Sequence, residues 1–88
     1  MFYVYLLRSL SDPSKVYTGF TNDLKNRLLA HNGGDSLHTA KYLPWEIETY
    51  LAFKSERLAK DFETYLKSGS GQAFASKRFR PTSKLEII

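Results

Sequence analysis

Alternating apolar and polar positions predict three short strands. Residues 2–7 (Phe-Tyr-Val-Tyr-Leu-Leu) favour a strand, and apolar side chains occur on both of its faces, so we expect both faces to be covered. A second strand is predicted over residues 15–20. It should run antiparallel to the first, because the connection at 9–14 is too short for a parallel crossover. A third strand is predicted over residues 45–53. Its single buried face should consist of Trp45, Ile47, Thr49, Leu51 and Phe53.

A first helix is predicted after the second strand. Thr21 or Asn22 can cap its start, and Asp23 suits the positive end of the helix dipole. The helix should end at the glycine pair 33–34. The following stretch, 35–43, is predicted to be a loop that borders the functional site. Its polar, basic or aromatic side chains are Thr39, Lys41 and Tyr42.

A second helix is predicted from Glu56 to about Ser68, with Ser55 as its cap. Its core stripe should consist of Leu58, Phe62, Tyr65 and Leu66. Glu63 lies one step off this stripe, so we expect it at the edge of the core. The glycine-rich stretch 68–71 should end the helix, and residues 72–79 should form a short helix or turn. The anchors of that segment should be Ala73, Phe74 and Phe79.

The order of elements predicts an α+β fold, in which a small three-stranded sheet is flanked by helices in the order β-β-α-β-α plus a short C-terminal helix. The chain of 88 residues suits one domain, with residues 80–88 as a tail. Leu85, Ile87 and Ile88 of this tail could dock at an edge of the sheet. Apolar residues make up 42% of the chain, which is enough for one core.

Cysteine is absent, which excludes disulfides and cysteine zinc sites and favours a reducing, cytoplasmic location. The N-terminus lacks the features of a signal peptide. No apolar run approaches the roughly 20 residues that span a bilayer, so we expect no membrane association.

The net charge of +4 is compatible with a polyanionic partner. The distribution of charge is more informative than the total, since the acidic residues are scattered while basic residues gather near the C-terminus. The basic residues in this region are Lys77, Arg78, Arg80 and Lys84. Such a cluster either contacts nucleic acid or serves only as a solubilising end.

Candidate chemistry lies in the first two strands and the first helix. Tyr5 and Tyr17 stand in the paired strands, and Arg27 and His31 lie one helical turn apart on one face of the helix. Gly19, inside a strand pattern, indicates a bulge, a close approach by another backbone or a ligand, or a simple strand end. Two phenols, a guanidinium and an imidazole predict a site that binds or cleaves a phosphodiester.

These residues resemble a known signature. Tyr3-Val4-Tyr5 and Tyr17-Thr18-Gly19 are similar to the two triplets of the GIY-YIG nuclease superfamily, with Tyr3, Val4 and Thr18 replacing the usual residues. Arg27 and His31 stand where members place an arginine and a histidine on the first helix. The resemblance extends to about Phe79. It is closest to small, stand-alone bacterial members, which are similar in turn to the N-terminal nuclease domain of the excision-repair subunit UvrC and to some homing endonucleases.

The resemblance implies a role for each site residue. Glu63 would bind a divalent cation, Mg²⁺ or Mn²⁺, and Tyr17 would act as general base. Arg27 would bind phosphate, and Tyr5 would orient water or the phosphate. His31 would assist Tyr5 or contact phosphate. We expect five further positions to contact nucleic acid: Gly19, Lys41, Lys67, Lys77 and Arg78.

The function implied by the resemblance is metal-dependent DNA endonuclease activity that nicks one strand or cleaves branched structures, as in DNA repair or recombination. A monomer with one site suits a single nick, and a protein partner could supply specificity. The alternative is a nucleic-acid-binding module with weak or no turnover. Phe20 and Ala75 favour this alternative, because relatives have a lysine and an asparagine near these positions. A third possibility is a protein-interaction domain that uses Trp45 and the C-terminal apolar residues.

Overall fold

The computed structural model describes residues 1–79 of the chain. Its centre is a three-stranded antiparallel sheet of β1 (Phe2–Ser9), β2 (Val16–Thr21) and β3 (Trp45–Phe53). β1 lies between the other two strands, so β2 and β3 are the edges of the sheet. The predicted antiparallel pairing of the first two strands is confirmed, and so are the bounds of the third.

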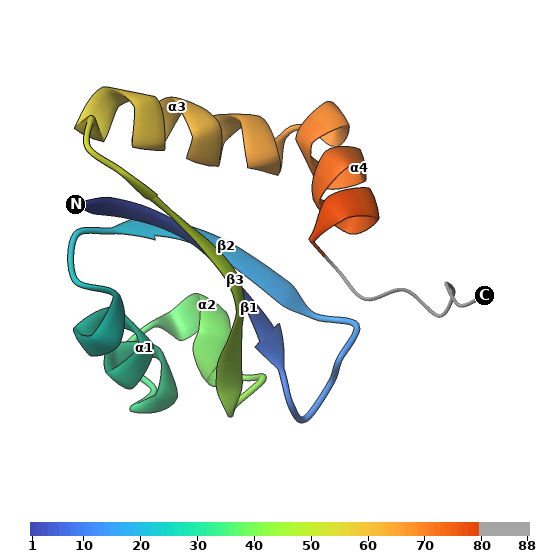
Figure 1. The fold of residues 1–88 in the computed structure, drawn as a ribbon. Coiled ribbons are helices and arrows are strands. Elements are labelled where there is room, and N and C mark those ends of the chain that lie inside the picture. Colours follow the sequence, from blue (N-terminus) through green and yellow to red (C-terminus); the bar gives the residue numbers. More distant parts are fainter. Residues whose placement is uncertain (80–88) are drawn as a thin grey trace.

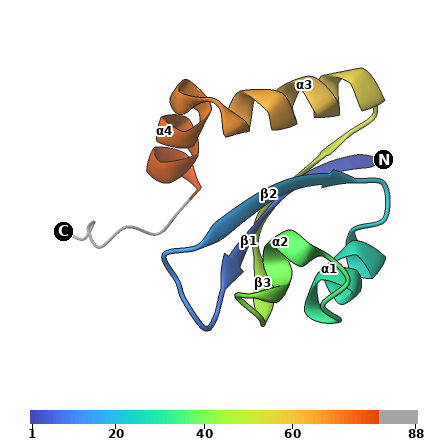
Figure 2. The ribbon, with the colours of Figure 1, turned by 180° about the vertical axis from the view of Figure 1, so that it is seen from behind.

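Helices cover both faces of this sheet. Helices α1 (Leu24–Asn32) and α2 (Leu37–Ala40) lie on one face, and α3 (Glu56–Lys67) and α4 (Gly69–Arg78) lie on the other (Figures 1 and 2). This is the α+β architecture that the sequence predicts. Among residues 1–79, no helix combines the length and apolar character required to cross a bilayer.

Alternation along β1 separates two apolar clusters. Val4 and Leu6 are buried against α3 and α4, whereas Tyr5 and Leu7 are buried on the face of α1 and α2. Both faces of β1 are therefore covered, as predicted. Each fully buried side chain of this size contributes about 1.5–3 kcal/mol to folding. The central strand is thus a rigid base for any side chain that it presents.

A bulge in β3 contradicts the prediction that this strand buries a single face. The register shifts between Leu6 and Leu7 of β1, where β3 has Glu48 as an extra residue. Before the bulge, Trp45 packs on the side of α1. Beyond it, Phe53 packs on the side of α3. The prediction fails because one inserted residue exchanges the two faces of the strand.

Two helices differ from the prediction in their bounds. Helix α2 occupies residues 37–40, inside the stretch predicted to be a loop. Helix α4 begins at Gly69, so the glycine-rich stretch both ends α3 and forms the first turn of α4. The Ser68 hydroxyl accepts from the Gly71 N–H and caps α4. Helix α1 is capped by Asp23, and not by Thr21 or Asn22.

The predicted core stripe of α3 is partly wrong. Leu58 and Tyr65 are 50% and 40% exposed, whereas Ala59 and Leu66 are the buried residues of this helix. The cap at Ser55 is confirmed. In α4, Phe74 packs on the core as predicted, as does Phe79 just after the helix. Ala73 is exposed, however, and the buried alanine is Ala75. The predictions for Arg80, Lys84, Leu85, Ile87 and Ile88 lie outside the described residues.

Candidate functional site

Tyr5 is the centre of the site. It lies in β1 directly opposite Gly19 of β2, and only 1% of its surface is exposed. A Cβ atom added to Gly19 would lie 2.3 Å from the Tyr5 hydroxyl and 2.4 Å from Cζ. Gly19 therefore leaves room for the hydroxyl end of the Tyr5 ring beside β2. A close approach is what the structure shows at this glycine, but the approaching group is the Tyr5 side chain, and not a backbone or a ligand as predicted.

A chain of hydrogen bonds extends from Arg27 through Tyr5 into the protein. The Arg27 Nε–H donates to the Tyr5 hydroxyl at 3.2 Å, and that hydroxyl lies 3.0 Å from Nε2 of His31. Nδ1 of His31 lies 2.8 Å from the Thr39 hydroxyl, which lies 3.4 Å from the carbonyl oxygen of Ser36. Thr39 thus borders the site, as predicted for its loop.

The chemistry of these groups fixes the direction of each hydrogen bond in this series. Arg27 can only donate, so the Tyr5 hydroxyl accepts from it and donates its own hydrogen to His31. The Thr39 hydroxyl donates to the Ser36 carbonyl, so it accepts from the Nδ1–H of His31. We assign a neutral His31 with its hydrogen on Nδ1 from this network.

Electrostatics agree with this assignment. Burial raises the pKa of Tyr5, while the hydrogen bond and charge of Arg27 oppose the rise. Burial also lowers the pKa of His31, and the positive charge of Arg27 lowers it further. Both groups are therefore neutral near pH 7, and the proton between them stays on Tyr5.

Tyr17 and Arg27 form the accessible part of the site. The Tyr17 ring lies 4.9 Å from the His31 ring and 6.2 Å from the Tyr5 ring, measured between centroids. Tyr17 and Arg27 are half-buried, in contrast to Tyr5 and His31. The hydrogen bond to Tyr5 raises the pKa of Arg27, with a smaller contribution from the Tyr17 phenol. These two residues can meet a ligand, whereas the fully buried His31 cannot contact phosphate.

Glu63 comes from the other layer of the fold. Its helix, α3, covers the face of the sheet opposite α1 (Figure 1). However, α3 also contacts the edge strand β2, and the Glu63 carboxylate is close enough for its charge to raise the pKa of Tyr5. Its side chain is 21% exposed and forms an ion pair with Lys67 at 3.0 Å. The predicted position at the edge of the core is confirmed.

Residues 1–79 contain no group of three or more His, Cys, Asp or Glu side chains that could surround a metal ion. A single, partly exposed carboxylate nevertheless fits hydrated Mg²⁺, which retains several waters and uses one or two protein carboxylates. Glu63 satisfies this requirement, provided that a cation can displace Lys67 from it.

The other predicted nucleic-acid contacts are scattered. Lys41 is exposed after α2, and its ammonium lies 5.7 Å from the centre of the Tyr42 ring. Lys77 and Arg78 are exposed in the last turn of α4, which covers the other face of the sheet from the Tyr5 side chain. Lys67 and Gly19 are the members of this set that lie beside the Tyr5 and Glu63 groups.

Sequence reasoning missed one structural support of the site. The Asn32 side chain donates to the Trp45 carbonyl at 3.0 Å and accepts from the Trp45 N–H at 2.7 Å. The Trp45 indole N–H donates to the Thr39 carbonyl at 2.8 Å. These bonds hold α1 and α2 against β3 and so fix His31. Nothing in the sequence pattern indicates this pairing.

The arrangement of two strand tyrosines, a glycine and a helical arginine agrees with a comparison against known families. A family model described as the GIY-YIG catalytic domain matches residues 1–78. This chain belongs to the GIY-YIG family. The expected resemblance is confirmed, and a nuclease-type domain is the class of function that the family indicates.

Relatives of this GIY-YIG chain include proteins named UPF0213 from Streptococcus pyogenes. Those of serotypes M3 and M1 and of serotype M5 (strain Manfredo) are each 36% identical over 66 residues. The similarity covers 74% of this chain and 70% of each relative.

Proposed function

We propose that this chain is a metal-dependent DNA endonuclease whose site consists of Tyr5, Tyr17, Arg27, His31 and Glu63. The observation that supports this most strongly is the convergence of the first four side chains. They are separated in sequence, yet each lies within hydrogen-bonding or ring-contact distance of another. A structural core has no need for a half-buried guanidinium bonded to a phenol.

Arg27 and Tyr17 would contact the substrate. Arg27 uses Nε for Tyr5, so its terminal nitrogen atoms can bind a phosphate oxygen in the planar geometry that guanidinium favours. Tyr17 would act as general base and accept a proton from the attacking water. An ordinary phenol has a pKa of about 10, so this role depends on positive charge nearby. Arg27 supplies one such charge.

Tyr5 and His31 would be positioning residues. Tyr5 is almost completely buried and holds the Arg27 guanidinium through its hydroxyl, and His31 holds that hydroxyl in place. The interpretation that His31 assists Tyr5 is therefore preferred over direct contact with phosphate. The Gly19 backbone allows this arrangement.

Glu63 would bind the divalent cation, Mg²⁺ or Mn²⁺. A bound cation would neutralise charge on the phosphate oxygens and lower the pKa of a bound water. Glu63 needs no other carboxylate for this role, since Mg²⁺ retains its waters.

The organisation of the chain bears on the substrate. We propose one domain over residues 1–88 with one site, which suits a single nick or the cleavage of a branched structure in repair or recombination. A protein partner would supply further specificity. A cytoplasmic monomer is the form that we propose.

A module that binds nucleic acid without turnover is the alternative. Phe20 faces the layer of α3, where it packs on the core and the Lys60 ammonium lies 5.3 Å from its ring centre. It therefore provides no cation beside Tyr17. This departure favours the alternative.

The test is incubation of the purified chain with Mg²⁺ or Mn²⁺ and single-stranded, duplex, nicked or branched DNA. We expect cleavage that is lost in Glu63→Ala and Tyr17→Phe. Glu56→Ala and Tyr50→Phe are matched controls, because both residues are exposed and outside the site. Salt-sensitive binding without any product, in every metal and with every DNA, would support the binding module.

A further inference from the structure

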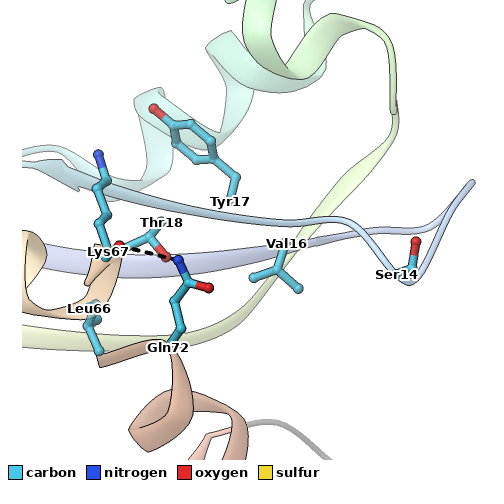
Figure 3. Close-up of a pocket in the computed structure, with 7 residues that line it drawn as sticks. All are labelled: Ser14, Val16, Tyr17, Thr18, Leu66, Lys67 and Gln72. Carbon is cyan, nitrogen blue, oxygen red and sulfur yellow. Dashed lines mark hydrogen bonds between the residues drawn. The ribbon is translucent and has the colours of Figure 1, made fainter. Parts of the chain in front are cut away.

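A concave groove of about 370 Å³ lies along the outer edge of β2. Tyr17 and Thr18 of the strand form one wall, and Lys67 and Gln72, from the junction of α3 and α4, form the other (Figure 3). The amino end of Lys67 and the phenol of Tyr17 extend toward the same side of β2 (Figure 3). The groove therefore opens next to the proposed cleavage site.

The pattern of backbone hydrogen bonds shows which backbone groups of β2 point toward β1 and which point outward into the groove. The Ser9 N–H donates to the Lys15 carbonyl at 3.0 Å, toward β2, and the Leu10 N–H donates to the Pro44 carbonyl at 2.8 Å, toward β3. Residues of an antiparallel strand alternate in this way. Odd-numbered residues of β1 therefore pair with β2, and even-numbered ones with β3.

This alternation identifies the backbone donors of β2 that point outward. Tyr17 and Gly19 lie opposite odd-numbered residues of β1 and direct their N–H groups toward it. Val16 and Thr18 direct their N–H groups, together with their carbonyl oxygens, away from the sheet. Within residues 1–79, neither of these two N–H groups has a backbone hydrogen bond to another element. Two residues of an extended strand span about 6.8 Å, so the two donors can serve neighbouring groups of one extended ligand.

The side chains of the groove add charge and further donors. The Lys67 ammonium is the charged group of its lining, and its side chain is 54% exposed. The Gln72 amide donates to the Lys67 carbonyl at 3.2 Å, which leaves a second N–H for a ligand. Among residues 1–79 no acidic side chain lines the groove itself, and the Lys67 ammonium is paired with Glu63 beside it at 3.0 Å. Backbone N–H groups, an ammonium and an amide together favour an anionic ligand.

We infer that this groove binds the phosphate backbone of an unpaired nucleic-acid strand next to the bond that is cleaved. The inference rests on the proposed function, because the proximity of Tyr17 connects the groove to a phosphodiester. The N–H groups of Val16 and Thr18, which have no backbone partner within residues 1–79, lie in a row along β2, across the groove from the junction of α3 and α4. A single flexible strand can follow this row, whereas the pairing partner in a duplex would meet the helices. The preferred substrate is therefore an unpaired or frayed end, such as a flap.

The first test measures binding without metal, so that cleavage plays no part. A short fluorescent oligodeoxynucleotide is titrated in EDTA at several salt concentrations. We expect Lys67→Gln to weaken binding several-fold and to reduce the salt slope by about 0.7, the value for one phosphate contact with a single strand. Lys60→Gln is the matched control, since Lys60 forms an ion pair with Glu56 on the same helix at 3.1 Å. The duplex of the same sequence should bind more weakly than the single strand.

The second test uses amide resonances of the wild-type chain, so it does not depend on any variant. On titration with the oligonucleotide, the amides of Val16 and Thr18 should shift strongly, and those of Tyr17 and Gly19 should shift much less. Equal affinity and salt slope for Lys67→Gln and wild type, or no shift at the two outward amides, would overturn the inference. If these amides shift with protein concentration alone, the edge pairs with a second copy, and the inference is also wrong.

The outcomes separate the groove from the proposed activity. Cleavage by the wild-type chain together with unchanged binding by Lys67→Gln would leave the endonuclease proposal intact and refute the groove. Binding at the outward amides without any cleavage would refute turnover and support the groove.

Discussion

The hydroxyl of Tyr5 occupies the space in which a side chain at position 19 would lie. The two residues face each other across β1 and β2, and a Cβ atom on Gly19 would lie 2.3 Å from that hydroxyl. Because Tyr5 also bonds to Arg27 and His31, it cannot move aside without breaking both hydrogen bonds. The glycine and the tyrosine are therefore one structural unit, and the site depends on it.

Gly19→Ala should destabilise the protein by about 1–3 kcal/mol, the usual cost of overpacking a rigid interior. Chemical denaturation would measure the loss in the free energy of unfolding. Gly69→Ala is the control, because no atom lies within 4 Å of the Cβ position at this exposed residue. A Gly19→Ala variant as stable as wild type would show that Tyr5 can relocate at little cost.

The stability of the protein should fall on acidification below about pH 6.5. Burial lowers the pKa of His31 in the folded state, whereas in the unfolded state it is about 6.5. Between these two values the unfolded chain binds more protons, so the free energy of unfolding rises with pH, by at most about 1.4 kcal/mol per pH unit. Denaturation at a series of pH values measures this slope.

His31→Gln should flatten that slope, because the group that gains the proton is absent. The exposed His38 in α2 provides the control, and His38→Gln should keep the wild-type profile. A profile that is unchanged in His31→Gln would mean that another group accounts for the acid sensitivity.

Addition of Mg²⁺ should raise the melting temperature if Glu63 binds the ion. A ligand at about 100 times its dissociation constant stabilises the folded state by about 2.7 kcal/mol. Glu63→Gln should lose this response, and Glu56→Gln, which removes another ion pair with a lysine four residues later on the same helix, should retain it. Removal of the metal by EDTA should reverse the effect in wild type.

Lys67→Gln should strengthen the response to Mg²⁺, because the ammonium no longer competes for the Glu63 carboxylate. Thermal melts across a range of Mg²⁺ concentrations measure the change in affinity. Weaker binding of Mg²⁺ in this variant would contradict such competition.

The ion pair of Arg8 and Glu48 should stabilise the bulge in β3. Arg8 forms two bonds to the carboxylate, at 2.6 and 3.2 Å, and also donates to the Pro13 carbonyl. The two side chains are only 23% and 11% exposed, so Glu48→Gln should cost roughly 1–3 kcal/mol. Arg57→Gln, in a pair with 78% and 64% exposure, should cost less than about 1 kcal/mol. Equal losses in urea denaturation would refute this difference.

The elements that depend on local pattern were predictable from the sequence. Alternation defined the three strands and both faces of the first. The spacing of Arg27 and His31 placed them on one helical face, and they do meet at Tyr5. The family resemblance, which reflects the order of such motifs along the chain, pointed to the same three residues. These features depend on neighbours along the chain, which the sequence shows directly.

Other features follow only from contacts between distant segments. The bulge at Glu48 reverses the two faces of β3, and helix α2 forms where Trp45 and His31 hold Thr39. The burial of His31, the direction of its hydrogen bonds and the groove along the outer edge of β2 likewise arise when the layers assemble. The sequence by itself determined which groups were available and, for β1 and α1, on which face of the element they lay. Only the tertiary structure decided which of them are buried, paired or open to a ligand, because desolvation and packing depend on all elements together.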